Sequence, residues 1–192
     1  MKKALILNGH QYYDNVAVGN LTQSIINRAK EFFIKNGYEV LEATVDKEYN
    51  IEEESKKLQE ADVVFFQHPV YWMGMPWKAK KYLDEVLTQG AHYASDGRSR
   101  DDASKKYGSG GLLDGKYMIS LTYNCPTTEF DNKDGYFDGL SLDEANIADH
   151  KIFQFCGLKP TETFSVHDIF KGDLDLNKEL DRLESILTKN FS

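Results

Sequence analysis

The residues most able to do chemistry gather in one short stretch, Pro69 to Trp77, which reads PVYWMGMPW. This stretch is rich in aromatic, methionine and proline residues and has no charged side chain. Such a segment suits a flat apolar ligand, because side chains can cover its faces while backbone N–H and C=O groups meet its polar rim. The isoalloxazine ring of a flavin has this shape and polarity. The alternative interpretation is that Trp72, Met73 and Trp77 cap the core.

A second chemical feature is the start of the first predicted helix, where Gly19, Asn20, Thr22 and Ser24 are small or polar. Free amides and the helix dipole make such an end a site for phosphate. The loop has neither a GxxxxGK[ST] nor a GxGxxG pattern, so an NTPase loop and a Rossmann turn are excluded. Ordinary N-capping is the alternative explanation of these residue types.

A third feature is the polar segment from Ala94 to Gly111, which ends in YGSGG at Tyr107. Its basic residues are Arg98, Arg100, Lys105 and Lys106. They could contact a phosphate, including the 2′-phosphate of NADPH, but the sequence favours a solvated charged surface. The five histidines show no metal-ligand spacing and no CxxC motif occurs, so no metal site is predicted.

The elements that must position these residues follow a regular alternation. Strands are expected at 4–7, 38–45, 62–69, 116–124 and 161–168, and helices at 21–37, 50–61, 76–90, 142–157 and 177–191. Alternating strands and helices indicate a parallel sheet with helices on both faces. We therefore predict one α/β domain over residues 1–192, with a flavodoxin-like five-stranded sheet of order 2-1-3-4-5. Long loops follow strands 1, 3 and 4, whose carboxyl ends form the usual ligand site of such sheets.

Composition narrows the class of protein further. A net charge of −8 and an isoelectric point near 5.1 argue against binding to nucleic acid or to anionic membranes. No apolar run approaches the ~20 residues of a membrane span, and the start MKKALILNG reads as a strand, not as a secretory signal. Two cysteines give no disulfide framework, and a cytoplasmic location is expected.

Three segments resemble a known family: QHPVYWMGMPWKAKKYLDEV, YASDGRSRDDASKKYGSGG and KYMISLTYNCP. The chain resembles, over nearly its whole length, the modulator of drug activity B proteins, which are bacterial NAD(P)H:quinone oxidoreductases of flavodoxin-like fold. The resemblance implies a homodimer with sites at its interface, FAD as cofactor, NADPH or NADH as co-substrate with NADPH favoured, and a quinone as acceptor. It also implies ping-pong two-electron reduction to the hydroquinone, which would protect against quinone and oxidative stress.

The resemblance also implies which residues form the site. The FAD pyrophosphate and adenosine would contact Ala17, Gly19, Asn20, Leu21 and Ser24. The isoalloxazine would lie against Pro69, Val70, Tyr71, Trp72 and Met73, with Thr122, Tyr123, Asn124 and Cys125 along its other edge. Tyr107 would approach the flavin from the partner subunit. As a separate hypothesis about the mechanism, Tyr107, or His68 near the slot, would give a proton or hydrogen bond to the quinone oxygen. Val70, Tyr71, Tyr123 and Cys125 differ from the family pattern and are expected to reshape the substrate pocket.

Three other functions fit the same fold. An FMN flavodoxin that carries electrons would suit the acidic charge but would not need the apolar slot. A flavin-bound redox regulator stays open. A receiver-type signalling domain is disfavoured, because the acids it needs after strands 1 and 3 are replaced by NGH and QHP.

Overall fold

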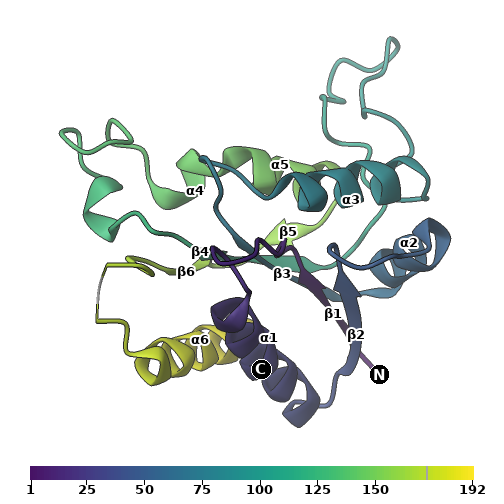
Figure 1. Ribbon diagram of the computed structural model, residues 1–192. Coiled ribbons are helices and arrows are strands. Elements are labelled where there is room, and N and C mark those ends of the chain that lie inside the picture. The colour runs from purple at the N-terminus through teal and green to yellow at the C-terminus, as the bar shows by residue number, and fades with distance from the viewer. Residues whose placement is uncertain (172) are drawn as a thin grey trace.

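The centre of the fold is a parallel sheet, drawn in Figure 1 from the computed structural model, which describes residues 1–171 and 173–192. Its strands are β1 (Lys3–Asn8), β2 (Glu39–Thr44), β3 (Val63–Pro69), β4 (Lys116–Thr122), β5 (Lys159–Pro160) and β6 (Phe164–Val166). The order is β2-β1-β3-β4-β5, and β6 also pairs with β4, so the predicted order is confirmed.

The predicted fifth strand is present as two short pieces, β5 and β6. Tyr117 of β4 pairs with Pro160, and Ser120 pairs with Phe164. Between these pairs β4 advances by three positions and the partner segment by four. The extra residue forms a bulge, which interrupts the ladder.

Two layers of helices cover the sheet (Figure 1). One layer holds α1 (Asn20–Lys35) and α6 (Leu176–Phe191), and the other holds α2 (Ile51–Glu60), α3 (Trp77–Thr88), α4 (Leu142–Ala145) and α5 (Ile147–Phe155), with a short η1 helix at Thr127–Glu129. β3 is buried along its whole length. Its alternate residues face opposite layers, with Phe65 in the core beside α1 and Phe66 in the core beside α3 and α5.

Two helix boundaries differ from the sequence prediction. The expected helix 142–157 is divided at Asn146, whose side chain donates to the Leu142 carbonyl (2.7 Å) and accepts from the Tyr123 hydroxyl (2.8 Å). Pro76 stands at the N-cap of α3, not at its first position, with φ −54° and ψ 144°. Asn50 caps α2 as predicted, since its side chain accepts from the Glu52 and Glu53 amides.

The segment 91–113 projects from the body of the molecule (Figure 1, upper right). Its two limbs meet where Ala94 donates to the Gly110 carbonyl (2.8 Å) and Leu112 to the His92 carbonyl (2.9 Å). The buried His92 ring lies 3.0 Å from the Ser55 hydroxyl and fastens this base to α2. Among the described residues, no helix combines the length and the apolar character that crossing a membrane requires.

Candidate functional site

The carboxyl ends of β1, β3 and β4 surround a cavity of about 220 Å³, which we call the rim cavity. It is lined by His10, Val16, Ala17, Val18, Gly19, Asn20, Leu21, Thr22, Pro69, Val70, Tyr71, Thr122, Asn124, Ile169 and Phe170. The structure thus brings together most of the residues that the sequence assigned to flavin binding. The cavity is smaller than the ~300–1,000 Å³ pockets that enclose whole small molecules, so it would take only part of a flavin nucleotide.

The amino end of α1 opens into the rim cavity without a side-chain cap. Gly19 occupies the N-cap position in the left-handed conformation, with φ 88°, and no side chain bonds to the first turn. The Gln23 amide donates to the Gly19 carbonyl (2.9 Å), so the amides of Asn20, Leu21 and Thr22 precede the helical ladder. Ordinary N-capping therefore does not explain these residues, and the free amides suit an anion.

His10 lies against this helix end. Its ring is within 3.2–3.5 Å of the position that a Cβ on residue 19 would occupy. Burial lowers the pKa of His10 below 6.5, while the nearby Asp46 carboxylate acts in the opposite direction. At neutral pH the ring is therefore largely neutral, with one nitrogen able to donate a hydrogen bond into the cavity.

The turn after β3 has an unusual backbone. Trp72 and Met73 both have positive φ, 49° and 68°, inside a two-residue turn closed by hydrogen bonds between Tyr71 and Gly74 (2.8 and 3.2 Å). Such turns favour Asn-Gly, because bulky residues are strained in the left-handed region. Strain of this kind persists only where the surroundings hold it, and it is concentrated at ligand sites.

Tyr71 ties this turn to the first loop. Its hydroxyl donates to the Gln11 carbonyl (3.3 Å), and its ring meets the edge of Tyr13 at 5.5 Å. Burial raises the pKa of Tyr71 to about 12, so the phenol stays protonated and remains a donor. On the other side of the turn, the Val70 amide donates to the Thr122 carbonyl (3.0 Å).

Asp46 ties the same loop to α3. Its carboxylate accepts from the Tyr12 amide (3.1 Å) and pairs with Lys78 (2.5 Å). Burial alone would raise the pKa of Asp46, but the Lys78 ammonium and the Tyr12 amide outweigh that effect and leave the pKa below its usual 3.8. The first loop, part of which lines the rim cavity, is therefore held in place by Asp46 after β2 and, through Asp46, by Lys78 of α3.

Trp72 and Met73 do not cap the core. Trp72 is 97% exposed and Met73 is 54% exposed, so the alternative interpretation of these residues, as caps of the core, is wrong. Trp72 instead borders a second hollow with Tyr13, Tyr71 and Trp77 on the outer side of the turn. A solvent-facing tryptophan on a strained turn is costly unless a ligand or a second chain covers it.

Three predicted side chains point elsewhere. The Ser24 hydroxyl donates to the Asn20 carbonyl (3.1 Å), one turn inside α1. Tyr123 is buried and bonds to Asn146, because the side chain after Thr122 points into the opposite layer. Cys125 is half-buried beyond the cavity, with its thiol 3.5 Å from the Pro126 carbonyl.

His68 differs most from the expectation that it contacts substrate. Its ring is fully buried under the end of β3 and bonds to the Pro69 carbonyl (3.0 Å) and to Asp149 (3.1 Å). A ring enclosed in this way cannot touch a quinone in the rim cavity. Any role of His68 must therefore act through the residues it holds.

Tyr107 is 70% exposed and packs its ring 5.5 Å from Phe155, the last residue of α5. That end of α5 lies at the amino edge of the sheet, where β4 begins. The rim cavity lies beyond the other end of β4, which spans roughly 20 Å at about 3.3 Å per residue. Tyr107 therefore lies far from the rim cavity of its own chain.

Sequence reasoning missed part of the lining. His10 was considered only as a metal ligand, although its place directly after β1 could have indicated it. Ile169 and Phe170 follow the last strand at the same rim, and Phe170 is exposed. Among the residues described, no cluster of three His, Cys, Asp or Glu is placed to hold a metal.

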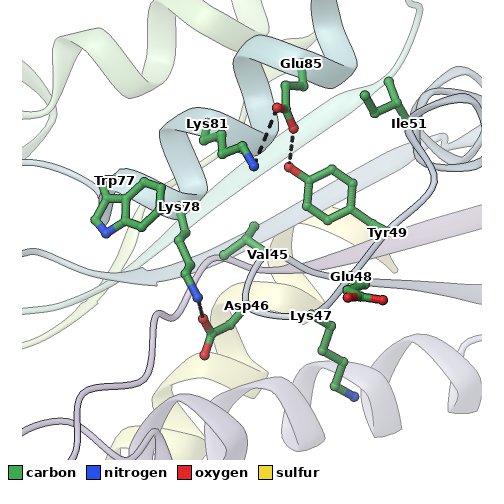
Figure 2. Close-up of a pocket in the computed structure, with 10 residues that line it drawn as sticks. All are labelled: Val45, Asp46, Lys47, Glu48, Tyr49, Ile51, Trp77, Lys78, Lys81 and Glu85. Carbon is green, nitrogen blue, oxygen red and sulfur yellow. Dashed lines mark hydrogen bonds and ion pairs between the residues drawn. The ribbon is translucent and has the colours of Figure 1, made fainter.

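A larger hollow, of about 530 Å³, lies between the end of β2 and α3 (Figure 2). Its polar groups are engaged with one another: Lys78 with Asp46, Lys81 with Glu85 (3.6 Å), and the Tyr49 hydroxyl with Glu85 (2.6 Å). The rim cavity differs in its lining, which includes no Asp, Glu, Lys or Arg and combines the amino end of α1 with the carboxyl ends of three strands.

Comparison with known proteins agrees with this architecture. A family model described as flavodoxin-like fold matches residues 2–187. The chain belongs to this flavodoxin-like family. NADPH:quinone oxidoreductase MdaB of Haemophilus influenzae is 38% identical over 171 residues, covering 88% of each protein. The predicted resemblance to modulator of drug activity B proteins is thereby confirmed.

Solved structures share the flavodoxin-like fold at low identity. A putative quinone reductase from Klebsiella pneumoniae superposes with a TM-score of 0.78 at 17% identity, covering 100% of this chain and 86% of that one. General stress protein 14 of Treponema denticola, solved in complex with FMN, superposes with a TM-score of 0.69 at 17% identity, covering 98% and 99%. At these identities the likeness concerns the fold alone.

Proposed function

We propose that the protein is an FAD-dependent NADPH:quinone oxidoreductase that reduces quinones to hydroquinones by two electrons. The observation that carries this proposal is the rim cavity, where an uncapped helix end and a strained aromatic turn face each other. The 38% identity to a protein named NADPH:quinone oxidoreductase supports it.

The residues present fit a flavin nucleotide. The amides of Asn20 and Leu21 would meet its phosphates, since they are unpaired and lie at the positive end of a 16-residue helix. Val70 and Tyr71 would cover one face of the ring, and the polar ends of Thr122 and Asn124 would lie at its edge. The Trp72 and Met73 amides at the turn would donate to a ring that gains negative charge on reduction.

When bound, FAD supplies a centre that can take a hydride from NADPH and pass it to a quinone. The chain itself positions the partners and excludes water, with Trp72 as an exposed aromatic wall beside the cavity. NADPH and quinone would use one slot in turn, so we expect ping-pong kinetics. The physiological role we propose is protection against quinone and oxidative stress.

We further propose that the enzyme works as a homodimer in the cytoplasm. The small size of the rim cavity and the exposure of Trp72, Met73 and Trp77 support a second chain over the site. Tyr107 would then contribute to the active site of the neighbouring chain, since it lies far from the rim cavity of its own chain. Both cysteines are free, which is usual in a reducing compartment.

The second candidate is an FMN-dependent electron carrier. The observation that favours it is that one structural neighbour was solved in complex with FMN. Purified protein saturated with FAD or FMN separates the two proposals. A visible flavin spectrum, bleaching by NADPH, and reoxidation by menadione with FAD as the released cofactor in mass spectrometry would support the reductase. Flavin reduction that no quinone reverses would support the carrier, and failure to bind either flavin would overturn both.

A further inference from the structure

His68 and Asp149 form a buried polar pair between the end of β3 and the first turn of α5. The His68 Nε2 atom lies 3.1 Å from the Asp149 Oδ2 atom, and the two side chains are 0% and 6% exposed. The other ring nitrogen, Nδ1, lies 3.0 Å from the Pro69 carbonyl oxygen. Both ring nitrogens thus face oxygen atoms.

The Pro69 carbonyl depends on this histidine. Two residues earlier, the Gln67 carbonyl accepts from the Gly9 amide (2.8 Å). Carbonyls two residues apart on a strand face the same neighbour, and beyond Gly9 the chain has turned into the first loop. The Nδ1–H group of His68 therefore supplies the hydrogen bond to the Pro69 carbonyl that the first strand no longer provides. Since a carbonyl has no proton to give, Nδ1 must carry one.

This tautomer determines how many protons His68 and Asp149 hold between them. With Nδ1 protonated, the contact between Nε2 and Oδ2 is a hydrogen bond only if another proton lies between them. Without that proton, a nitrogen lone pair would face a carboxylate oxygen in a site sealed from water, which is repulsive. The pair therefore holds one shared proton and carries no net charge.

The neighbouring titratable groups have partners of their own. Burial, with a smaller contribution from Asp149, raises the pKa of Tyr123 to about 12, and its hydroxyl donates to Asn146. His150 lies 2.9 Å from the Tyr117 hydroxyl through Nδ1 and 3.3 Å from Asp143 through Nε2. Neither group contributes the proton between His68 and Asp149.

We propose that His68 and Asp149 are positioning residues of the flavin site, which fix the Pro69 carbonyl and so hold the strained Tyr71–Gly74 turn from its base. The shared proton is what lets His68 keep both of its ring bonds. The effect on flavin binding rests on the proposed function, whereas the effect on the turn does not. Asp149 lies on α5, outside the cavity, and among the described residues its side chain hydrogen-bonds to His68 alone.

Two variants distinguish loss of the shared proton from loss of the hydrogen bond to the Pro69 carbonyl. In Asp149→Asn, the amide group can donate to Nε2, so a neutral ring keeps both hydrogen bonds and only the shared proton disappears. In the double variant His68→Phe with Asp149→Leu, apolar side chains fill the core, which avoids leaving an unpaired buried charge, but the donor to Pro69 is lost. His150→Gln, at the next residue of α5, which is also buried, is the matched control.

The test begins with flavin-free protein. Nitrogen-15 NMR of the His68 ring should show Nδ1 protonated and a proton shared at Nε2 in the wild type, and an unprotonated Nε2 in Asp149→Asn. Amide exchange in the Tyr71–Gly74 turn should accelerate at least tenfold in the double variant and stay within twofold in Asp149→Asn and His150→Gln. An unprotonated Nδ1, or unchanged exchange in the double variant, would overturn the proposal.

Flavin affinity is then a separate readout. We expect FAD to bind the double variant at least tenfold more weakly than the wild type, and both single variants within twofold of it. Equal loss in His150→Gln would mean that α5 has merely loosened, which contradicts a specific positioning role. If the wild type bound no flavin, the proposed function would fail while the exchange and NMR results would still decide the role of the pair.

Discussion

The His10 ring occupies the space beside Gly19 at the amino end of α1: a Cβ on residue 19 would lie 3.2 Å from the His10 Cε1 atom. The glycine is needed twice, because its φ of 88° lies in the left-handed region and because the imidazole occupies the space of a side chain. The phosphate end of the proposed site is therefore set by backbone conformation as well as by charge.

Gly19→Ala should weaken flavin binding at least tenfold and destabilise the fold by about 1–2 kcal/mol, the cost of a left-handed alanine. The matched control is Gly37→Ala, which has φ 79° but open space around its Cβ. It should lose a similar amount of stability and keep flavin affinity. Isothermal titration and urea unfolding measure both quantities, and equal affinities for the two variants would contradict the assignment.

Replacing the strained pair by Trp72→Asn with Met73→Gly should stabilise the protein by about 1–2 kcal/mol, since Asn-Gly suits a two-residue turn with positive φ. Quinone turnover should fall, because the exposed indole wall beside the cavity is lost. Thermal unfolding and steady-state kinetics with menadione test the two parts. A less stable variant would show that the turn is not strained, and full activity would remove Trp72 from the site.

Asp46→Asn should loosen the first loop, because the amide keeps a bond to the Tyr12 N–H but loses the ion pair with Lys78. We expect about 1 kcal/mol of lost stability or less for this partly exposed pair, and flavin affinity about threefold weaker. Amide exchange at Tyr12 reports the loosening directly. Asp84→Asn, which breaks the solvent-exposed pair with Lys80 on α3, should change neither affinity nor exchange.

Acid should destabilise the flavin-free protein through its buried histidines. Burial lowers the pKa of His92 below 6.5 in the folded state, so below pH 6.5 the unfolded chain binds a proton that the folded chain excludes. Stability is therefore lost as pH falls from 6.5 toward the lowered folded pKa. His10 and His167 act in the same direction.

His92→Gln should make this loss shallower, because glutamine can still reach the Ser55 hydroxyl but does not titrate. Melting temperatures between pH 8 and 5.5 test this expectation. An identical slope in the variant would show that His92 does not contribute to the acid sensitivity.

Tyr107 should act in trans. We expect Tyr107→Ala and Gly19→Ala homodimers to have little quinone reductase activity. Mixed dimers should recover one working site, made from the intact Gly19 of one chain and the intact Tyr107 of the other. Co-expression with two affinity tags isolates the mixed dimer for assay. A mixed dimer no more active than either parent would contradict a role of Tyr107 in trans. Full turnover by Tyr107→Phe would show that the phenol hydroxyl takes no part in the mechanism.

The sequence predicted the fold well because its signals are local. Continuous apolar runs such as Val63–Phe66 indicate doubly buried strands, and Asn50 indicates a helix start. It also predicted the two walls of the rim cavity, because chain order alone places the ends of parallel strands at one edge. The break at Asn146 was missed, because the Tyr123 hydroxyl that fixes it lies 23 positions away in the chain.

Side-chain direction was the main thing that could not be predicted. A histidine directly before Pro69 reads as a site residue, and only the position of Asp149 across the layer shows that His68 is enclosed. The exposure of Trp72 likewise depends on the left-handed backbone of Trp72 and Met73, a conformation that neither residue type predicts. Such features arise from tertiary packing overriding local preference.

The projecting segment 91–113 closes on itself where Tyr93 bridges Gly111. Its ends are therefore already joined at the spacing of a hairpin, and the body of the molecule does not depend on the tip for its core. Exchange of the tip for a short turn should give a chain that still folds, and in the proposed dimer this chain would lack the Tyr107 side chain that its neighbour needs. A foreign peptide inserted at the same place would be displayed away from the body of the molecule.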